Sequence, residues 1–276
     1  MGNRLKTTVL LASLTAFLVF LGGLFGGETG MIFCFILSLV LNFFSYWYSD
    51  KIVLKLYKAT PLTQSSKIYE IVQRLCSKRS LPTPKIYSIP SSALNAFATG
   101  RNPNNAAIAV TEGLEKALDD EELEGVLAHE LSHIQNRDTL VSTIAASLAG
   151  AIMMIANMAK WAAIFGVGGG DRDDRPHPAV LLLTAFIAPL AALLIQMAIS
   201  RSREYLADKT GAETTHNPHG LARALKKLST QSALPAPAHT AHLFIMNPLT
   251  KSGVASLFST HPPLEERIRR LESIRP

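Results

Sequence analysis

Two histidines four residues apart, with a glutamate beside the first, form the pattern with the clearest chemistry in this sequence. They are His129, Glu130 and His133, in a stretch that favours a helix. On an α-helix, side chains four positions apart lie on one face, so both imidazoles can reach a single metal ion. Glu130 lies one position round from the first histidine, where a carboxylate can act as general base towards a water held by the metal. The spacing indicates a hydrolytic zinc site.

A catalytic zinc ion takes three protein ligands and leaves one coordination position open. The C-terminal third of the chain offers these acids and histidines: Glu204, Asp208, His216, His219, His239, His242 and His261. Glu204 is the strongest candidate. It lies just past the fourth apolar segment, at about the same depth relative to the membrane as His133, which lies just before the third. Asp208 lies four residues on along the same helical face, where it can accept the free ring N–H of a ligand histidine. A solvated charged turn at a membrane-helix end is the alternative interpretation of these two carboxylates.

The composition is typical of a membrane protein. Of 276 residues, 48% are hydrophobic and 17% are charged, against about 25% charged residues in soluble domains. The mean hydropathy is +0.20. The net charge of +6 comes from Lys and Arg that flank apolar segments, which favours anchoring at the lipid bilayer over nucleic-acid binding. Cys34 and Cys76 have no CxxC partner, so a thiolate zinc ribbon is excluded and two unpaired cysteines in a reducing compartment are expected.

Four apolar segments have about the 20 residues that a membrane-spanning helix needs. They are Thr7–Leu24, Met31–Trp47, Leu140–Phe165 and Ala179–Ile199. A cleavable signal peptide is the alternative for the first, since Arg4 and Lys6 precede it, but no convincing cleavage site follows. The helix with the histidines is expected to run directly into the third segment, which places the zinc site close to a membrane surface.

The basic residues that flank these segments predict the direction of each crossing. Lys and Arg are concentrated before the first, after the second and after the fourth, whereas the connecting loops lack this excess. Cytoplasmic loops carry such an excess, so both termini and the active site are expected on the cytoplasmic side. His177 lies in a loop on the opposite side and cannot reach His133. The predicted organisation is a transmembrane hairpin over 1–49, a protease part over 50–139, a second hairpin over 140–199 and a second protease part over 200–276.

Between the hairpins, the sequence predicts a helix and a small sheet. Ser65–Lys78 carries apolar residues at helical spacing, and prolines follow it. Three short apolar stretches separated by turn residues predict strands, namely Lys85–Ile89, Ala93–Thr99 and Ala106–Val110. Acidic residues at 119–124 then open the histidine-bearing helix, because negative charge suits the N-terminal end of a helix dipole. The predicted fold class is mainly α with a small β-sheet.

Longer motifs surround these residues. They are AHELSH at 128–133, SRSREYLAD at 200–208, STHPPLEERI at 259–268 and NAFATG at 95–100. Together they resemble the M48 family of membrane metallopeptidases, and most of all its bacterial HtpX branch with four membrane spans. The resemblance covers essentially the whole chain. It implies a cytoplasmic gluzincin-type domain, with one zinc ion bound by His129, His133 and Glu204, and Glu130 as catalytic base. It also implies activity in the cytoplasmic (inner) membrane, where membrane or misfolded proteins are hydrolysed in a stress response.

The resemblance assigns two further groups of residues. Asn95, Ala96 and Phe97 would form an edge strand that holds an extended substrate by main-chain hydrogen bonds. The alternative is that Asn95 merely starts a strand. His261 would steady the oxyanion that develops on the substrate, or else it marks the entry to an amphipathic helix at Leu264–Ile274.

Other functions fit parts of the same pattern. A catalytically silent zinc-binding scaffold would need a fourth protein ligand, and Glu130 argues against it. A transporter would place ionisable residues in mid-membrane, whereas here they gather at the ends of the spans. Processing of prenylated CAAX proteins belongs to the eukaryotic M48 branch, which has more spans than this chain offers. The sequence therefore predicts a zinc endopeptidase that acts on membrane proteins, and Ala233–Pro248 is expected to be a loop over its cleft.

Overall fold

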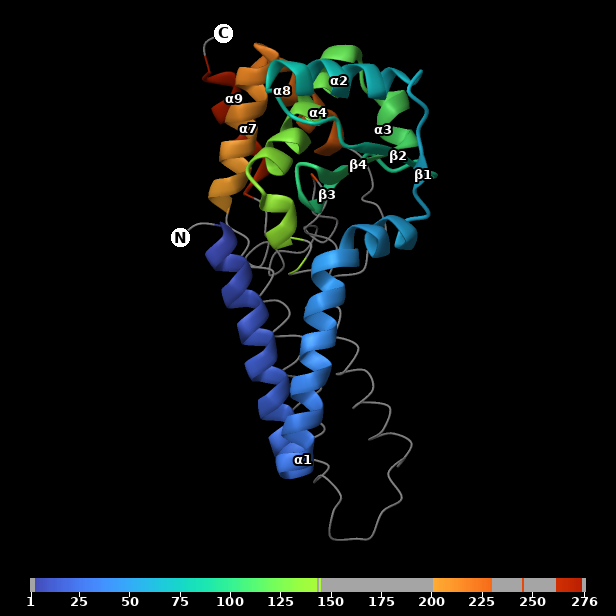
Figure 1. Cartoon of the computed structure of the whole chain (residues 1–276). Helices are drawn as coiled ribbons and strands as arrows, with labels where there is room; N and C mark the ends of the chain where they lie inside the picture. Colours follow the sequence, from blue (N-terminus) through green and yellow to red (C-terminus); the bar gives the residue numbers. More distant parts are fainter. Residues whose placement is uncertain (1–2, 143, 145–200, 230–244, 246–261, 275–276) are drawn as a thin grey trace.

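A long helical hairpin and a domain of helices packed on a small mixed sheet make up the described part of the chain (Figure 1). This computed structural model describes residues 3–142, 144, 201–229, 245 and 262–274. The elements are α1 (Asn3–Leu56), β1 (Thr60–Pro61), α2 (Lys67–Lys78), β2 (Lys85–Ile89), β3 (Ala96–Asn102), β4 (Asn105–Thr111), α3 (Glu112–Ala117), α4 (Asp120–Gln135), α7 (Arg201–Thr215), α8 (Pro218–Ser229) and α9 (Leu264–Glu272). The prediction of a mainly helical fold with a small sheet is confirmed.

Helix α1 is a hairpin of two arms that run antiparallel (Figure 1). The helix breaks at Gly27, whose φ of 56° lies in the left-handed region that favours glycine. Across the arms, Asn42 Nδ2 donates to Thr15 Oγ1 at 3.1 Å. Near the break, a Cβ on Gly22 would overlap the carbonyl group of Gly30, so small residues allow the two arms to approach closely.

The hairpin carries the described segment that could cross a membrane. Among the described residues, Gly26–Tyr48 is long and apolar enough for one crossing, and it contains the predicted second span, Met31–Trp47. Where Thr7–Leu24 was predicted, a shorter apolar helical segment lies at Leu11–Leu24. The third and fourth predicted spans lie almost wholly outside the described residues, so the four-span organisation stays a prediction.

The upper end of the hairpin touches the sheet. The Arg101 guanidinium lies 4.3 Å from the centre of the Trp47 ring, within the range of a cation–π interaction. The ring centres of Tyr57 and Phe97 are 5.8 Å apart. Since Phe97 and Arg101 both belong to β3, this strand is attached directly to the end of the hairpin.

Strand β3 lies at one edge of the four-stranded sheet, whose order is β1-β2-β4-β3. Strands β2 and β4 are parallel, and β3 is antiparallel to β4. The strand begins at Ala96, later than predicted. Asn95 instead makes hydrogen bonds to the backbone of Ala96 and to the side chain of Thr111. Asn95 Oδ1 accepts from Ala96 N at 3.0 Å, and Asn95 N donates to the Thr111 hydroxyl at 3.0 Å. Asn95 therefore lies immediately before the strand, and its role in substrate binding stays a prediction.

Helix α4 passes through the centre of the domain, in contact with β3, α2, α7 and α8 (Figure 1). Its start is fixed by a capping box, in which the Asp119 side chain accepts from Glu122 N at 2.9 Å and Glu122 Oε2 accepts from Asp119 N at 3.0 Å. Because neighbours cover it on several sides, even its polar residues His129, Glu130 and Ser132 are buried.

The helix that carries the histidines ends before the third apolar segment. Helix α4 ends at Gln135, Arg137 has a φ of 58°, and helical backbone resumes at Asp138. A left-handed residue just past a helix end satisfies terminal carbonyl groups, and here Arg137 N donates to Ile134 O at 3.1 Å. Strand β1 and helices α3 and α8 were not predicted; α8 carried a signal, with Pro218 at its first position and leucines at helical spacing.

Helix α7 approaches α4 closely at Gly211. A Cβ there would lie 3.1 Å from the backbone nitrogen of His129 and 3.4 Å from the carbonyl carbon of Ala128. These distances leave room for glycine but not for a larger side chain without a shift of one helix. Glycine at this position therefore sets the distance between the two helices whose side chains form the site described below.

Replacement of Gly211 by leucine is expected to push α7 away from α4 and to destabilise the fold by about 2 kcal/mol, since overpacking outweighs the better helix propensity of leucine. Lys209→Leu, at an exposed position of the same helix, is the matched control and should unfold close to the parent temperature. Thermal unfolding in detergent, followed by circular dichroism, measures both. Equal unfolding temperatures for the two variants would contradict this account of the packing.

Candidate metal centre

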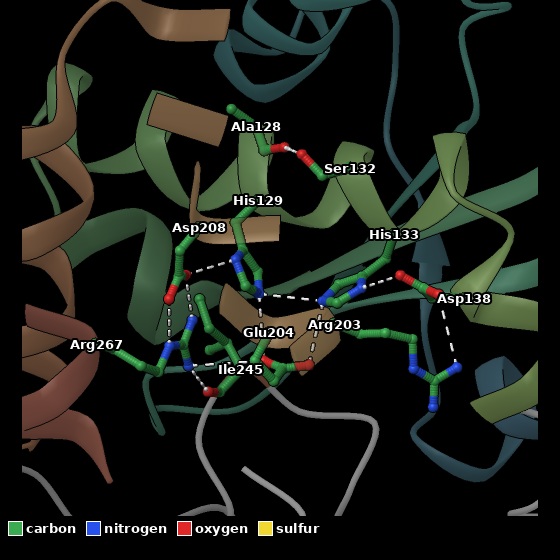
Figure 2. Close-up of polar contacts among 10 residues, drawn as sticks. All are labelled: Ala128, His129, Ser132, His133, Asp138, Arg203, Glu204, Asp208, Ile245 and Arg267. Atoms are coloured by element: carbon green, nitrogen blue, oxygen red, sulfur yellow. Dashed lines mark hydrogen bonds and ion pairs between the residues drawn. The ribbon is translucent and has the colours of Figure 1, made fainter. Parts of the chain in front are cut away.

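Helices α4 and α7 direct two imidazoles and one carboxylate at a single point (Figure 2). The Nε2 atoms of His129 and His133 are 3.2 Å apart. One carboxylate oxygen of Glu204 lies 3.6 Å from His129 Nε2, and the other lies 3.5 Å from His133 Nε2. The three potential ligand atoms lie within 4.8 Å of one another.

These separations fit a zinc ion. With metal–ligand bonds of 2.0–2.2 Å, the corners of a tetrahedral site are about 3.4 Å apart. The two Nε2 atoms are 3.2 Å apart, and each lies 3.5 or 3.6 Å from a different oxygen of Glu204, so one ion can lie between the three side chains. Two imidazole nitrogens that face each other also need a cation or a proton between them. Among the described residues, this group offers three ligands, which is the number that a catalytic zinc ion takes from the protein.

Behind His129, a buried ion pair reaches its other ring nitrogen. Asp208 Oδ1 lies 2.9 Å from His129 Nδ1. The Arg267 guanidinium from α9 donates to both oxygens of Asp208, at 2.7 and 2.8 Å, and also to the Ile245 carbonyl at 3.1 Å. A bidentate pair of this kind fixes the carboxylate in place, and the carboxylate in turn can fix the orientation of the histidine ring.

The charged side chains around His129 shift one another's pKa values. Burial alone would raise the pKa of Asp208, but Arg267 and His129 lower it to about 2. Burial would lower the pKa of His129, yet hydrogen bonds to Asp208 and Glu204 raise it to about 9. Without a metal ion, the imidazole of His129 is therefore protonated at neutral pH, and the incoming cation takes the place of a proton.

Glu130 lies between α4 and the edge strand. It is 2% exposed, and the backbone N–H of Ala98 in β3 donates a hydrogen bond to its carboxylate. Burial raises the pKa of Glu130 above its ordinary value, against the opposing charges of His129 and His133. A carboxylate with a raised pKa is a better proton acceptor at neutral pH than an exposed one.

The structure brings together most of the residues that the sequence singled out. Those that meet at this point are His129, Glu130, His133, Glu204 and Asp208. Ala96 and Phe97 lie in β3, where Ala96 O accepts from Ile245 N at 3.3 Å and the Phe97 side chain is fully buried. His261 lies outside the described residues, so its role stays a prediction, as do those of His239 and His242.

Sequence reasoning missed three groups near the site. They are Arg267, the backbone N–H of Ala98, and Asp138, which lies 3.2 Å from His133 Nδ1. A signal for Asp138 was present, because an acid at the start of an apolar segment is costly unless it has a partner. No comparable signal marks Arg267, which is one of several basic residues in α9.

The fold and the side chains at this centre are those of a metallopeptidase, and comparison with known proteins agrees. The model of peptidase family M48 matches residues 62–275. A protease HtpX homolog of Syntrophobacter fumaroxidans is 57% identical over 282 residues, which cover 99% of this chain and 100% of the relative. Protease HtpX of Legionella pneumophila (strain Corby) is 51% identical over 281 residues, which cover 99% of this chain and 100% of the relative.

The chain therefore belongs to peptidase family M48, as its motifs predicted, and it is a membrane metallopeptidase. Among solved structures, the crystal structure of S. mikatae Ste24p resembles it with a TM-score of 0.53 and 20% sequence identity, over 98% of this chain and 65% of that one. At this level of identity the likeness is one of fold.

The Asp208–Arg267 pair predicts how metal-free stability depends on pH. The pKa of Asp208 falls from an ordinary 3.8 to about 2 in the folded protein. The carboxylate therefore stabilises the fold above about pH 4 and loses this contribution, about 2 kcal/mol, as the pH falls towards 2. Asp208→Asn should lose about 3 kcal/mol at pH 7, because Arg267 remains buried without a counter-charge, and should lack that acid-dependent step.

Urea unfolding in detergent with a chelator present, from pH 2 to pH 7, measures this difference. Asp120→Asn is the matched control, since Asp120 is exposed on the same domain. A parallel loss of stability with acid in the parent and in Asp208→Asn would be the contrary result.

Proposed function

We propose that the protein is a zinc-dependent endopeptidase that cleaves membrane or misfolded proteins at the cytoplasmic face of the membrane. The observation that carries this proposal is the convergence of His129, His133 and Glu204, with the buried carboxylate of Glu130 beside them. A catalytically silent zinc scaffold would need a fourth protein ligand, and it would have no use for a carboxylate such as that of Glu130 beside the metal. CAAX-type processing is the weaker candidate, because the eukaryotic branch that performs it has more membrane spans than this sequence predicts.

In the proposed mechanism, His129, His133 and Glu204 would hold the zinc ion. When bound, zinc lowers the pKa of a water molecule and polarises the scissile carbonyl. Glu130 accepts the proton of the attacking water and later delivers it to the leaving amine. The N–H of Ala98 keeps the Glu130 carboxylate at the edge of the sheet, and Asp208 holds the ring of His129 in the orientation that directs Nε2 at the site.

Strand β3 is the proposed support for the substrate backbone, since it is the edge strand nearest the site. Its Ala96 carbonyl already accepts from Ile245. A substrate that adds to this edge must therefore displace Ile245 or pair farther along the strand. Arg101 of this strand contacts Trp47 at the end of the hairpin, which would place the strand near the bilayer. This favours the proposal that the cleavage sites of substrates lie close to the membrane.

Replacement of Glu130 by glutamine is expected to lower peptidase activity by at least about 100-fold, because an amide cannot accept the proton. Zinc content should stay at about one ion per chain, since the three ligands are intact. Protein purified in detergent with a chelator, reloaded with zinc and assayed on casein, provides the measurement. Glu124→Gln is the matched control, because Glu124 lies on the same helix and faces Arg74 and Lys78.

His129→Ala tests the metal site separately, and it should bind little zinc. The proposal fails if Glu130→Gln cleaves casein as fast as Glu124→Gln does. Zinc bound equally by His129→Ala and the parent would instead reject the ligand assignment.

The proposed orientation predicts that both ends of the protein lie in the cytoplasm. Green fluorescent protein fused after Pro276 is then expected to fluoresce in bacterial cells, whereas alkaline phosphatase fused at the same point should be inactive. Fusions within 166–178 should give the opposite pair of results, because that loop is predicted on the far side. An active phosphatase at Pro276 would reverse the orientation.

A further inference from the structure

Asp138 lies between His133 and a second buried arginine, Arg203 (Figure 2). Asp138 Oδ2 is 3.2 Å from His133 Nδ1, and Asp138 Oδ1 is 3.6 Å from Arg203 Nη1. Asp138 is 3% exposed and Arg203 is 7% exposed. The guanidinium of Arg203 makes no hydrogen bond within the described part of the chain, so the charge of Asp138 is the interaction there that compensates for its burial.

The arrangement repeats the one behind the other histidine. On one side, Arg267 contacts Asp208, which contacts Nδ1 of His129. On the other, Arg203 contacts Asp138, which contacts Nδ1 of His133. In both, one carboxylate joins a buried guanidinium to the ring nitrogen that faces away from the centre.

The end of α4 makes this contact possible. Asp138 is five residues after His133, and in a continuous helix it would lie on a different face. The helix instead ends at Gln135, and the left-handed residue Arg137 turns the backbone. This turn brings the Asp138 carboxylate back to the ring of His133, and the next helical segment starts at Asp138 itself.

We propose that Asp138, with Arg203 behind it, is a positioning residue for His133, an inference that rests on the proposed metal site. A carboxylate only accepts hydrogen bonds, so it selects the tautomer in which His133 carries its proton on Nδ1. The Nε2 lone pair then points at the metal position without rearrangement. The guanidinium of Arg203, 3.6 Å away, holds the Asp138 carboxylate in this buried place. Arg203 is the residue next to the ligand Glu204.

A purely structural ion pair between the start of α7 and the segment after α4 would account for the same distances. The two roles differ in what they affect. A structural pair stabilises the metal-free fold and leaves the intrinsic metal affinity unchanged. A positioning pair changes the metal affinity of protein that is already folded.

The test is the zinc affinity of Asp138→Asn, measured in detergent by competition with a chromophoric chelator. We expect about a 10-fold loss, the effect usual for a carboxylate behind a ligand histidine. Asp120→Asn makes the same chemical change at an exposed site and should keep the parent affinity. Affinity equal to that of the parent in folded Asp138→Asn overturns the inference, whereas a parent that binds no zinc overturns the metal site itself.

Arg203→Gln, alone and combined with Asp138→Asn, tests the second half of the pair. If Arg203 acts through Asp138, the double variant loses no more affinity than Asp138→Asn alone. Fully additive losses would show that Arg203 acts independently.

A spectrum of the parent keeps the inference testable if Asp138→Asn does not fold. In zinc-loaded protein with ¹⁵N-labelled histidines, both metal-bound rings should carry their proton on Nδ1. A ring that binds zinc through Nδ1, assigned to His133 by its absence in His133→Gln, would contradict the inference.

Discussion

The carboxylate of Asp208 is the point on which the described domain depends, because three segments far apart in sequence meet there. It comes from α7, it contacts His129 on α4, and it receives two hydrogen bonds from Arg267 on α9. All three side chains are buried. In a medium of low dielectric constant, no one of these charges is tolerated without the others, so the ion pair couples the packing of the helices to the arrangement of the site.

That coupling explains how buried polar groups can lie in the centre of an otherwise apolar domain. Leu127, Leu131 and Val126 pack around the same turns of α4 that carry His129 and Glu130. Edge strand β3 covers one side of the helix and provides the N–H of Ala98, while α7 covers another. The site is therefore formed by well-packed helices and a strand, which hold side chains more firmly than loops do.

The metal-site residues with a local pattern could be predicted from the sequence. The spacing of His129 and His133 predicts them as ligands. Glu204 is predicted because the membrane topology places it at about the same distance from the bilayer as His133. The start of α4 was predicted from the acidic residues at 119–124, because they lie close together in sequence at the end of the helix that favours negative charge. Arg267 and Asp138 were not predicted, since their partners are set by tertiary packing and by one left-handed residue, Arg137. The same limit applies to β1, whose two residues are too few to show a period.

The division of the site between α4 and α7 has a consequence for biosynthesis. His129, Glu130 and His133 leave the ribosome well before Glu204, and Arg267 follows much later. A nascent chain that has reached only the first helix holds two histidines and a glutamate with nothing to complete them. The ligand set can close only after the intervening apolar stretch has been made, and its supporting arginine arrives later still. A partly synthesised chain therefore lacks the complete site.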